Sequence, residues 1–506
     1  MNLRYILPLS LLVACAPEID EGPGAGLAFQ IEAAPDNLAR FHSALIGAEP
    51  VGAPATVTSG QVNERGDQLG RAMVIADFTG DGRGDLAIGV PFEDIGSVES
   101  SGSVLIYRGT GAGLVFHQAL TQAGLGLDEP FDHFGSALAA GDFDGNGVVD
   151  LAVGAPDEAP GGDPAAGAVF IFRGGANLTT GWVIDQASLG SGTNENSDRF
   201  GEALAAVDFS GDGKAELAVG APGDTVGGVR CGRVYLVSFG GAGPVSAGTV
   251  VQGALSPEEP SERFGSALAS GNFFGGAKSE LAVGAYGETV SGRRAGAVFI
   301  YQPVGAVLSP VIRLAQASMN EHKDLFGRSL AVGDFNGDGW RDLAVGAPGE
   351  NRQQGAIFIY NGGAAALSAG QVIDPRVDGV LPGDKFAWSL AAGDIDADGD
   401  ADLAVGAPRS ILAGNIRSGK VIWYRATVGV LSAVSPLTQT HFAVGNTDDD
   451  FGRAVAVGDL GNDGRAEIAV GSPTETVGLS RVGAAYVFRG VGADPSAWRR
   501  IVQAAP

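Results

Sequence analysis

The sequence contains little of what most catalytic and thiolate-metal sites are made from. Its 506 residues include two cysteines and five histidines. Cys15 lies in an N-terminal leader and Cys231 has no partner in the chain, which excludes a disulfide framework and favours a buried, inert thiol at Cys231. The histidines lack metal-ligand spacing, and no nucleophile elbow, phosphate-binding loop or zinc motif is present. We therefore predict that the protein is not an enzyme.

Positive charge is also scarce. The 32 Lys and Arg residues oppose 58 Asp and Glu residues, which gives a formal net charge of −26. Nucleic acids and anionic membrane surfaces attract basic faces, so neither is an expected partner. Much of the acidity falls in a turn that repeats along the chain, which makes cations the better candidates. Aromatic residues amount to 7% and lie mostly on predicted strands, which weakens a lectin-like interpretation.

Apolar runs long enough to cross a bilayer are absent after the leader. The leader has a single charge, Arg4, before a short apolar run, which is typical of a targeting segment. The run ends in Leu12-Val13-Ala14-Cys15, which resembles the lipobox of bacterial lipoproteins. The resemblance implies lipidation of Cys15 and a bacterial cell-envelope location, with the lipid anchor as the one membrane attachment; an ordinary signal peptide is the alternative. The expected segments are a lipoprotein signal peptide (1–14), a tether (15–55) and a folded body (56–506).

Glycine is abundant, with 82 residues, and one phrase returns seven times. The phrase is Phe-Gly, then an acidic turn, then Leu-Ala-Val-Gly-Ala-Pro. The first carboxylate or amide of the turn falls at Asp77, Asp142, Asp208, Asn272, Asp334, Asp394 and Asp459. A period of about 64 residues indicates one structural unit that is copied and stacked into a single body.

Each copy predicts four short strands. In the second copy, apolar segments at 136–143, 151–155 and 168–173 and a weaker one at 182–187 are separated by glycine- and proline-rich turns. The predicted fold is therefore all-β, a seven-bladed β-propeller of four-stranded antiparallel blades. A β-solenoid needs a shorter period, and a row of separate sandwiches needs a longer one. Either the C-terminal segment 499–506 or the N-terminal segment 54–62 could complete the last blade.

The acidic turns have the ligand pattern of calcium loops. Oxygen-bearing side chains recur at positions 1, 3, 5 and 9, and the residue at position 7 offers its carbonyl. Three turns have full sets, namely Asp142, Asp144, Asn146, Val148 and Asp150 in the second copy, Asp334, Asn336, Asp338, Trp340 and Asp342 in the fifth, and Asp394, Asp396, Asp398, Asp400 and Asp402 in the sixth. Three poorer sets are Asp77, Thr79, Asp81 and Asp85, then Asp208, Ser210, Asp212 and Glu216, and finally Asp459, Asp463 and Glu467.

We therefore expect three strong calcium sites and up to six in all, from these sets. Magnesium fits an all-protein cage less well, because it keeps its waters. The fourth turn has Asn272, Phe274, Gly276 and Glu280, and we expect it to hold no ion. For any single copy, a polar Asp-Gly turn without a metal is the alternative interpretation.

The repeated unit resembles the FG-GAP repeat, which is known from the seven-bladed head of integrin alpha subunits and from many bacterial surface proteins. The resemblance covers roughly residues 60–490 and implies structural calcium in the loop between the first two strands of a blade. The sequence departs from the pattern at Leu69, Tyr286 and Ala387 and in the fourth turn. The tripeptide Arg83-Gly84-Asp85 matches the motif that integrins recognise, but Asp85 is position 9 of a predicted calcium loop and should face the ion.

The face opposite the calcium loops is the expected surface for a protein or glycan ligand. An acid stands two residues before each Phe-Gly, at Asp67, Asp132, Asp198, Glu262, Asp324, Asp384 and Asp449. The connections between second and third strands add Arg230, Arg293, Arg294, Arg352, Arg409, Arg417 and Arg481. Alternatively, the acids bond nearby backbone amides and the arginines are solvated.

The resulting hypothesis is a lipid-anchored, calcium-stabilised, non-catalytic binding or adhesion scaffold. A carbohydrate-binding, lectin-like propeller, a propeller hydrolase and a purely structural envelope component are the alternatives, because a fold alone does not decide among them.

Overall fold

The structure is a computed structural model, and it describes most of the repeated region. The described residues are 55–56, 66–111, 113–122, 129–241, 243–305, 307–316, 322–364, 366–412, 416–442, 448–477, 480–490 and 495–502. All of them belong to one compact unit, Ala48–Pro506. The predicted signal peptide, Cys15 and the tether up to residue 54 lie outside the described residues.

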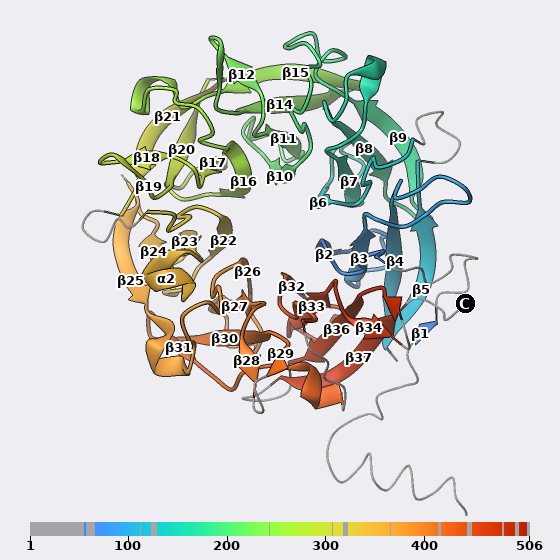
Figure 1. Ribbon diagram of the computed structural model, residues 1–506, viewed down its shortest axis with the longest axis vertical. Coiled ribbons are helices and arrows are strands. Elements are labelled where there is room, and N and C mark those ends of the chain that lie inside the picture. The colour runs from blue at the N-terminus through green and yellow to red at the C-terminus, as the bar shows by residue number, and fades with distance from the viewer. Residues whose placement is uncertain are drawn as a thin grey trace, which may run out of the picture. The chain divides into compact units, whose positions relative to one another are not determined.

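Seven antiparallel sheets surround a common centre, and each takes its strands in chain order from the centre outward (Figure 1). Blades 1 to 3 consist of β2 (Met73–Ala76), β3 (Asp85–Val90), β4 (Ser103–Thr110) and β5 (Gly113–Leu120), of β6 (Ala137–Gly141), β7 (Asp150–Ala155), β8 (Ala168–Arg173) and β9 (Thr179–Ile184), and of β10 (Ala203–Val207), β11 (Glu216–Ala221), β14 (Arg233–Gly240) and β15 (Gly243–Val250). The predicted fold class, a seven-bladed all-β propeller, is confirmed.

The remaining blades repeat this order. Blades 4 to 7 consist of β16 (Phe264–Gly271), β17 (Glu280–Ala285), β20 (Ala297–Val304) and β21 (Val307–Leu314), of β22 (Ser329–Gly333), β23 (Asp342–Ala347), β24 (Ala356–Asn361) and β25 (Ser368–Ile373), of β26 (Ser389–Gly393), β27 (Asp402–Ala407), β30 (Lys420–Thr427) and β31 (Val430–Ala433), and of β32 (Ala454–Gly458), β33 (Glu467–Ser472), β36 (Ala484–Arg489) and β37 (Ser496–Val502). The connections between second and third strands carry short hairpins, β12 (Thr225–Val226) with β13 (Val229–Arg230), β18 (Thr289–Val290) with β19 (Arg293–Arg294), β28 (Ile411–Leu412) with β29 (Ile416–Arg417) and β34 (Thr476–Val477) with β35 (Ser480–Arg481). None of the described helices is long and apolar enough to cross a membrane.

The core of the propeller lies between neighbouring blades. Seven clusters of buried apolar side chains each combine two adjacent blades, and one of them joins blade 7 to blade 1. The second strand of every blade is buried along its whole length because both of its faces pack on a neighbour. A blade therefore has no complete core of its own, which is why the copies must stack.

The Phe-Gly dipeptide fastens each blade to the one before it. Phe134 is fully buried, and its amide donates to the Ser101 carbonyl of blade 1 at 3.0 Å. Gly135 has a φ of +94°, which favours glycine, and a Cβ on Gly89 of blade 1 would lie 2.0 Å from the Gly135 carbonyl oxygen. The two glycines of the repeat thus permit a backbone contact that a side chain would block.

Both terminal segments take part in closing the ring. The C-terminal β37 supplies the fourth strand of blade 7 by pairing with β36, and β1 (Ala55–Thr56) adds a parallel strand outside it. The sequence left open which segment completes the blade. The answer is the C-terminal one, with the N-terminal one as a fifth, outermost strand.

Strand boundaries follow the predictions except at the rim. In blade 2 the third strand, Ala168–Arg173, agrees in full, whereas the fourth is Thr179–Ile184 and begins three residues before the predicted 182–187. This outer strand has one packed face, and Thr179 and Thr180 are exposed. The apolar residues that identify this strand in the sequence therefore lie only at its C-terminal end.

Candidate metal centre

The acidic turns lie between the first and second strands, on one face of the ring. In the second turn, Asp142 at position 1 accepts the amides of Gly145 and Gly147 at 2.8 Å. Asp144 accepts the amide of Asn146 at 3.1 Å, and Asn146 Oδ1 accepts the amide of Val148 at 2.7 Å. This turn is thus curled by its own polar side chains.

Position 9 opens the second strand and is buried in every copy. Asp150 is fully buried, and its carboxylate accepts the amide of Phe143 at 3.0 Å and that of Gly174 at 2.8 Å. Burial raises the pKa of Asp342 to about 6 and the pKa of Asp402 and Glu467 to about 7. A cation would offset the burial of these carboxylates.

Two of the three turns with full ligand sets bring three acids together. In the second turn, ligand oxygens of Asp142, Asp144 and Asp150 lie within 4.8 Å of one another, and in the sixth turn those of Asp394, Asp396 and Asp398 do so. In the fifth turn, which is described throughout, Asp334, Asp338 and Asp342 do not form such a group, although Asp334 and Asn336 make the same turn hydrogen bonds.

The sixth turn contains an unusual buried carboxylate. Asp396 is 8% exposed, and among the described residues its Oδ1 has no hydrogen-bond donor. Its Oδ2 pairs with Arg425 from β30. Burial, followed by the neighbouring charge of Asp398, raises the pKa of Asp396. An ordinary polar turn would use this oxygen for a backbone amide, as positions 1 and 5 do.

The poorer turns keep the same backbone arrangement with fewer carboxylates. At position 1, the carboxylates of Asp77, Asp208 and Asp459 each accept a backbone amide of the turn, as the position 1 residue does elsewhere. Ser210 stands at position 3 of the third turn, and Thr79 at position 3 of the first turn donates its amide to Asp85 at 2.9 Å. The members that complete these turns are Asp81, Asp212, Glu216, Asp463 and Glu467.

The fourth turn is closed by its own hydrogen bonds. Asn272 donates from its amide nitrogen to the Gly276 carbonyl at 2.7 Å, and Glu280 accepts the amide of Phe273 at 2.8 Å. Phe274 occupies position 3, where the other turns have oxygen, hydroxyl or glycine. The residues here do not form a cation cage.

Four turns receive an arginine that the ligand pattern of the turns does not predict. Arg108, Arg173, Arg425 and Arg489 come from the end of the third strand and pair with turn acids, at 3.3 Å to Asp81 and 3.1 Å to Asp463 for the first and last of them. The signal was present in the sequence as an Arg that directly follows the apolar run of the third strand. These arginines balance part of the turn charge.

Asp85 of the Arg83-Gly84-Asp85 tripeptide is fully buried, as expected for position 9. Its carboxylate accepts the amides of Thr79 and Gly109, at 2.9 and 3.0 Å. Arg83 donates to the carbonyl of Gly461 in the neighbouring blade at 2.8 Å. The tripeptide is therefore a structural element of the turn.

Cys231 is also buried, at 1% exposure, and burial raises the pKa of its thiol to about 11. A thiol with a raised pKa carries little thiolate at neutral pH, which agrees with the predicted inert side chain.

The seven acids before Phe-Gly correct one expectation. They are 0–2% exposed and so do not present carboxylates to a partner. Asp132, Asp198, Glu262 and Asp384 accept the backbone amide three residues before them, as in Glu129 to Asp132 at 2.8 Å. Asp67, Asp324 and Asp449 are buried in the same way. The structural alternative, in which the acids hold their turns, describes this ring.

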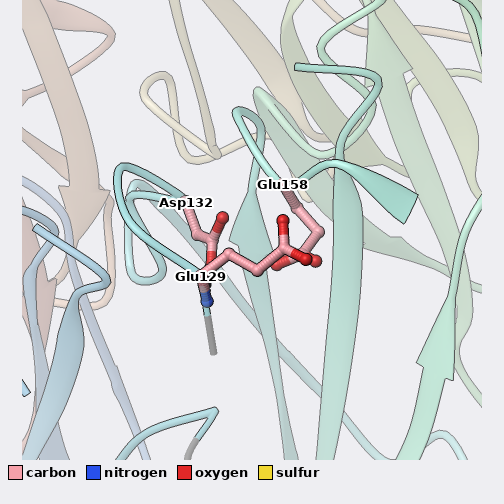
Figure 2. Close-up of side chains that lie close together, drawn as sticks. All are labelled: Glu129, Asp132 and Glu158. Atoms are coloured by element: carbon pink, nitrogen blue, oxygen red, sulfur yellow. Dashed lines mark hydrogen bonds between the residues drawn. The ribbon is translucent and has the colours of Figure 1, made fainter. Parts of the chain in front are cut away.

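A second buried acid accompanies most of these residues. It stands two residues after the Pro (or Tyr) of the second strand, at Glu93, Glu158, Asp224, Glu288, Glu350 and Glu475, with Ser410 in blade 6. Figure 2 shows Asp132 and Glu158 beside Glu129, and ligand oxygens of the three lie within 4.8 Å of one another. In blade 6, the Ser410 hydroxyl instead donates to Asp384 at 3.0 Å. The fixed spacing of this second acid could have been found in the sequence.

The arginines on the loops of the same face are exposed. Exposure agrees with a binding surface and equally with the alternative interpretation, in which the arginines are solvated. Arg230, Arg294 and Arg481 donate to carbonyls in the segment that leads into the Phe-Gly of their own blade. Arg352, Arg409 and Arg417 are exposed on the same connections.

Comparison with known proteins agrees with this architecture. The FG-GAP repeat family matches residues 69–107, 134–172, 200–237, 326–360, 386–421 and 451–488. These stretches are blades 1, 2, 3, 5, 6 and 7, and the fourth blade, whose turn lacks ligands, is not among them.

Among curated proteins, integrin alpha-4 of Xenopus laevis is 26% identical over 286 residues, 55% of this chain and 26% of that protein. Integrin alpha-PS2 of Drosophila melanogaster is 32% identical over 269 residues, 50% of this chain and 17% of that protein. A phosphatidylinositol-glycan-specific phospholipase D of Bos taurus is 31% identical over 203 residues, 38% of this chain and 24% of that protein. The matched region thus spans about a quarter or less of these relatives. With its repeats, its blades and these relatives taken together, the chain is an FG-GAP repeat protein that forms an integrin-like seven-bladed β-propeller.

Proposed function

We propose that the protein is a calcium-stabilised binding scaffold of the adhesion type, with its ligand face opposite the acidic turns. The arrangement of acids in the sixth turn is the observation that supports calcium binding. Three acids converge there within 4.8 Å, and one of them, Asp396, is buried with a carboxylate oxygen that no described donor satisfies. Calcium prefers hard oxygen ligands from flexible loops of this kind.

The ion would act on stability. It would offset the burial of the position 9 carboxylate and tie the turn between the first two strands of a blade. Asp142, Asp144, Asn146 and Asp150 would hold a second ion, with the Val148 carbonyl completing the set. Because neighbouring blades share their cores, tightening of one turn would stabilise the whole ring.

Chelation tests this part. Removing calcium with a chelator should lower the melting temperature of the protein, and adding calcium back should restore it. Asp396→Ala with Asp398→Ala should reduce the amount of bound calcium, measured by titration calorimetry. Glu280→Gln in the fourth turn is the matched control and should leave it unchanged. A melting temperature that is equal with and without chelator would overturn the proposal.

The non-catalytic role is also part of the proposal, although one relative is a phospholipase D. Among the described residues, His133 Nδ1 and Asp157 Oδ2 are 2.7 Å apart and form a histidine–carboxylate pair. The hydroxyl of Ser136 donates to the His133 carbonyl at 2.8 Å, so it is engaged away from the ring nitrogens. Hydrolysis of a phosphatidylinositol-glycan by the purified protein, lost in His133→Ala, would contradict the proposal.

A lipid anchor is the last part of the proposed function. The Leu12-Val13-Ala14-Cys15 motif supports attachment to a bacterial envelope membrane through Cys15. Cys15→Ser should move the protein from the membrane fraction to the soluble fraction of producing cells. Mass spectrometry of the N-terminal peptide would reveal the lipid, and an unmodified Cys15 would contradict the anchor.

A further inference from the structure

A cavity lies at the centre of the ring, where the first strands begin. Its volume is about 360 Å³, and all seven blades contribute to its wall, through residues that directly follow the Phe-Gly position. The first strands that bound it are β2, β6, β10, β16, β22, β26 and β32, which surround the centre in Figure 1. Because the acidic turns follow the other ends of these strands, the cavity opens on the face opposite the turns.

One side of this cavity is positively charged. The residue after Phe-Gly is Arg328 in blade 5, Arg453 in blade 7 and Arg71 in blade 1, where Leu69-Gly70 replaces Phe-Gly. Lys385 in blade 6 lies between them along the ring. These four residues, the cationic arc, come from four consecutive blades, since the ring closes from blade 7 to blade 1.

The cationic arc is not neutralised by neighbouring acids. Among the described residues, Arg71, Arg328, Arg453 and Lys385 form no ion pair, whereas Arg199 on the other side of the cavity pairs with Glu202 at 2.8 Å. The charges of Glu202 and Asp450 act on Arg71, and that of Asp450 acts on Arg453 and Lys385, but none of these acids forms an ion pair with the arc among the described residues. Burial and the charge of Arg71 lower the pKa of Arg453, and burial and the charge of Arg409 lower the pKa of Lys385.

Two departures from the repeat pattern place aromatic rings against three of the four residues of the arc. Blade 6 has Trp388 where other blades have Arg, Ser or Glu, and Arg328, Lys385 and Arg453 lie 4.9, 4.6 and 4.4 Å from its ring centre. Blade 4 has Tyr286 in place of Pro, and Arg328 lies 5.6 Å from that ring. Aromatic faces attract cations and fix their positions without cancelling their charge.

The arc is notable in a protein whose net charge is −26. Clustering half-buried cations without counter-charges is unfavourable, because burial and mutual repulsion both oppose the charged forms. The aromatic contacts offset part of this cost. A bound anion would offset the rest.

We propose that the cationic arc binds a small organic anion with two or more carboxylate or phosphate groups. Guanidinium groups donate paired hydrogen bonds to planar carboxylates and to phosphates, and three of them around one cavity select for more than one anionic group. The cavity volume is at the lower end of small-ligand sites, which favours a metabolite-sized anion or the acidic end of a larger ligand. This inference rests on the proposed function, because it names the ligand chemistry of the face left open there.

Titration calorimetry on the full chain in excess calcium, at constant ionic strength, tests the proposal. Tricarballylate serves as the carboxylate probe and fructose 1,6-bisphosphate as the phosphate probe. Saturable binding of either probe in a 1:1 ratio is expected, and the probe that binds more tightly identifies the source of the anionic group. Arg453→Gln and Arg328→Gln should each weaken binding about tenfold, as expected for loss of a charge-assisted hydrogen-bond pair.

Arg230→Gln is the matched control, because Arg230 is exposed on the same face outside the cavity. The affinity of this variant for the probe should equal that of the unaltered protein. A melting curve gives a second readout that does not depend on heats of binding. The probe should raise the melting temperature of the unaltered protein and raise it less in Arg453→Gln. Absence of binding by both probes, or equal affinity in the two cavity variants and the unaltered protein, would overturn the proposal. Neither result would alter the effect of chelation, so failure of the anion site and failure of the calcium proposal are distinguishable.

Discussion

Arg425, at the end of the third strand of blade 6, forms an ion pair with Asp396 in the acidic turn of the same blade. Its second guanidinium nitrogen lies 3.6 Å from Asp398, so one arginine spans two of the proposed calcium ligands. Blades 1, 2 and 7 have the same arrangement with Arg108, Arg173 and Arg489. A bound cation would therefore compete with the arginine for the same carboxylates, and the arginine would set how tightly the turn holds an ion.

The first prediction concerns this competition. Arg425→Gln should raise the calcium affinity of the sixth turn, because the ion no longer displaces a bound guanidinium. Since Arg425 is partly exposed, the gain should be small, up to about fivefold, as for exposed ion pairs worth about 0.2–1 kcal/mol. Calcium titration calorimetry measures it, and Arg376→Gln, which removes an ion pair with Asp374 outside the turns, is the control. Unchanged or weaker calcium binding in Arg425→Gln would show that the two cations do not compete.

The second prediction concerns pH and a buried pair of acids. Burial and a hydrogen bond to Glu288 raise the pKa of Glu262 to about 8, from an ordinary value of 4.5. Arg313 and Gln252 donate to the Glu288 carboxyl group, at 2.7 Å each, so Glu288 is an acceptor beside Glu262. The folded protein thus keeps the Glu262 proton after the unfolded chain has lost it.

The sign follows from proton linkage. Between about pH 4.5 and 8 the folded state binds more protons than the unfolded state, so stability falls as pH rises through this window. Glu262→Gln retains a donor toward Glu288 and cannot ionise, so it should flatten this fall and give a higher melting temperature than the unaltered protein at pH 8. Melting curves at pH 5, 6.5 and 8 measure the difference. Parallel curves for the two proteins would contradict the assignment.

The third prediction concerns Ala387, which replaces the glycine of Phe-Gly in blade 6. Its φ is +63°, a conformation that favours glycine, and Ala387→Gly should stabilise the protein by up to about 1 kcal/mol. Gly452→Ala makes the reverse change in blade 7, where φ is +88° and a Cβ would lie 2.8 Å from the Lys420 carbonyl, so it should destabilise. Denaturant unfolding measures both. Equal destabilisation by the two changes would mean that the local strain is not what matters.

The fourth prediction concerns ring closure. Ile501 on β37 is fully buried in the cluster that joins blades 7 and 1. Ile501→Ala should cost about 2–5 kcal/mol in the free energy of unfolding, as for other buried truncations. Val245→Ala on the outer strand of blade 3 is the control, because Val245 is 53% exposed and should change little. Similar effects of both changes would argue against a structural role of β37 in closure.

The repeat made the fold predictable, because one copy already contains the strand pattern and seven copies impose a ring. The ligand sets of the acidic turns were equally visible, since they depend on spacing within nine residues. The spacing of residues within a turn cannot predict that a side chain from another strand will contact that turn. Arg425 reaches the sixth turn across a sheet, and the fifth turn, with an equivalent sequence, does not gather its acids as the second and sixth do.

The burial of the acids before Phe-Gly was the other property that could not be predicted from the sequence. These acids recur once in every copy of the repeat. Regular spacing alone favours neither a binding surface nor an internal structural role. All seven carboxylates are buried, four of them accept the backbone amide three residues before them, and in most blades a second buried acid stands on the adjoining connection. The central arc went unnoticed for a related reason, since Arg71, Arg328, Trp388 and Arg453 are far apart in the chain and meet only when the ring closes.

The Phe-Gly contact, which joins each blade to its predecessor, also constrains the order of assembly during synthesis. Blade 1 has its own such segment, and Leu69 at its start pairs with Gly483 of blade 7, more than four hundred residues later. Until that later segment has left the ribosome, the growing chain is an open arc with one apolar flank of blade 1 uncovered. Contacts of such long sequence separation form late and slowly. The apolar flank of blade 1 thus stays uncovered for most of the time that the chain takes to be synthesised.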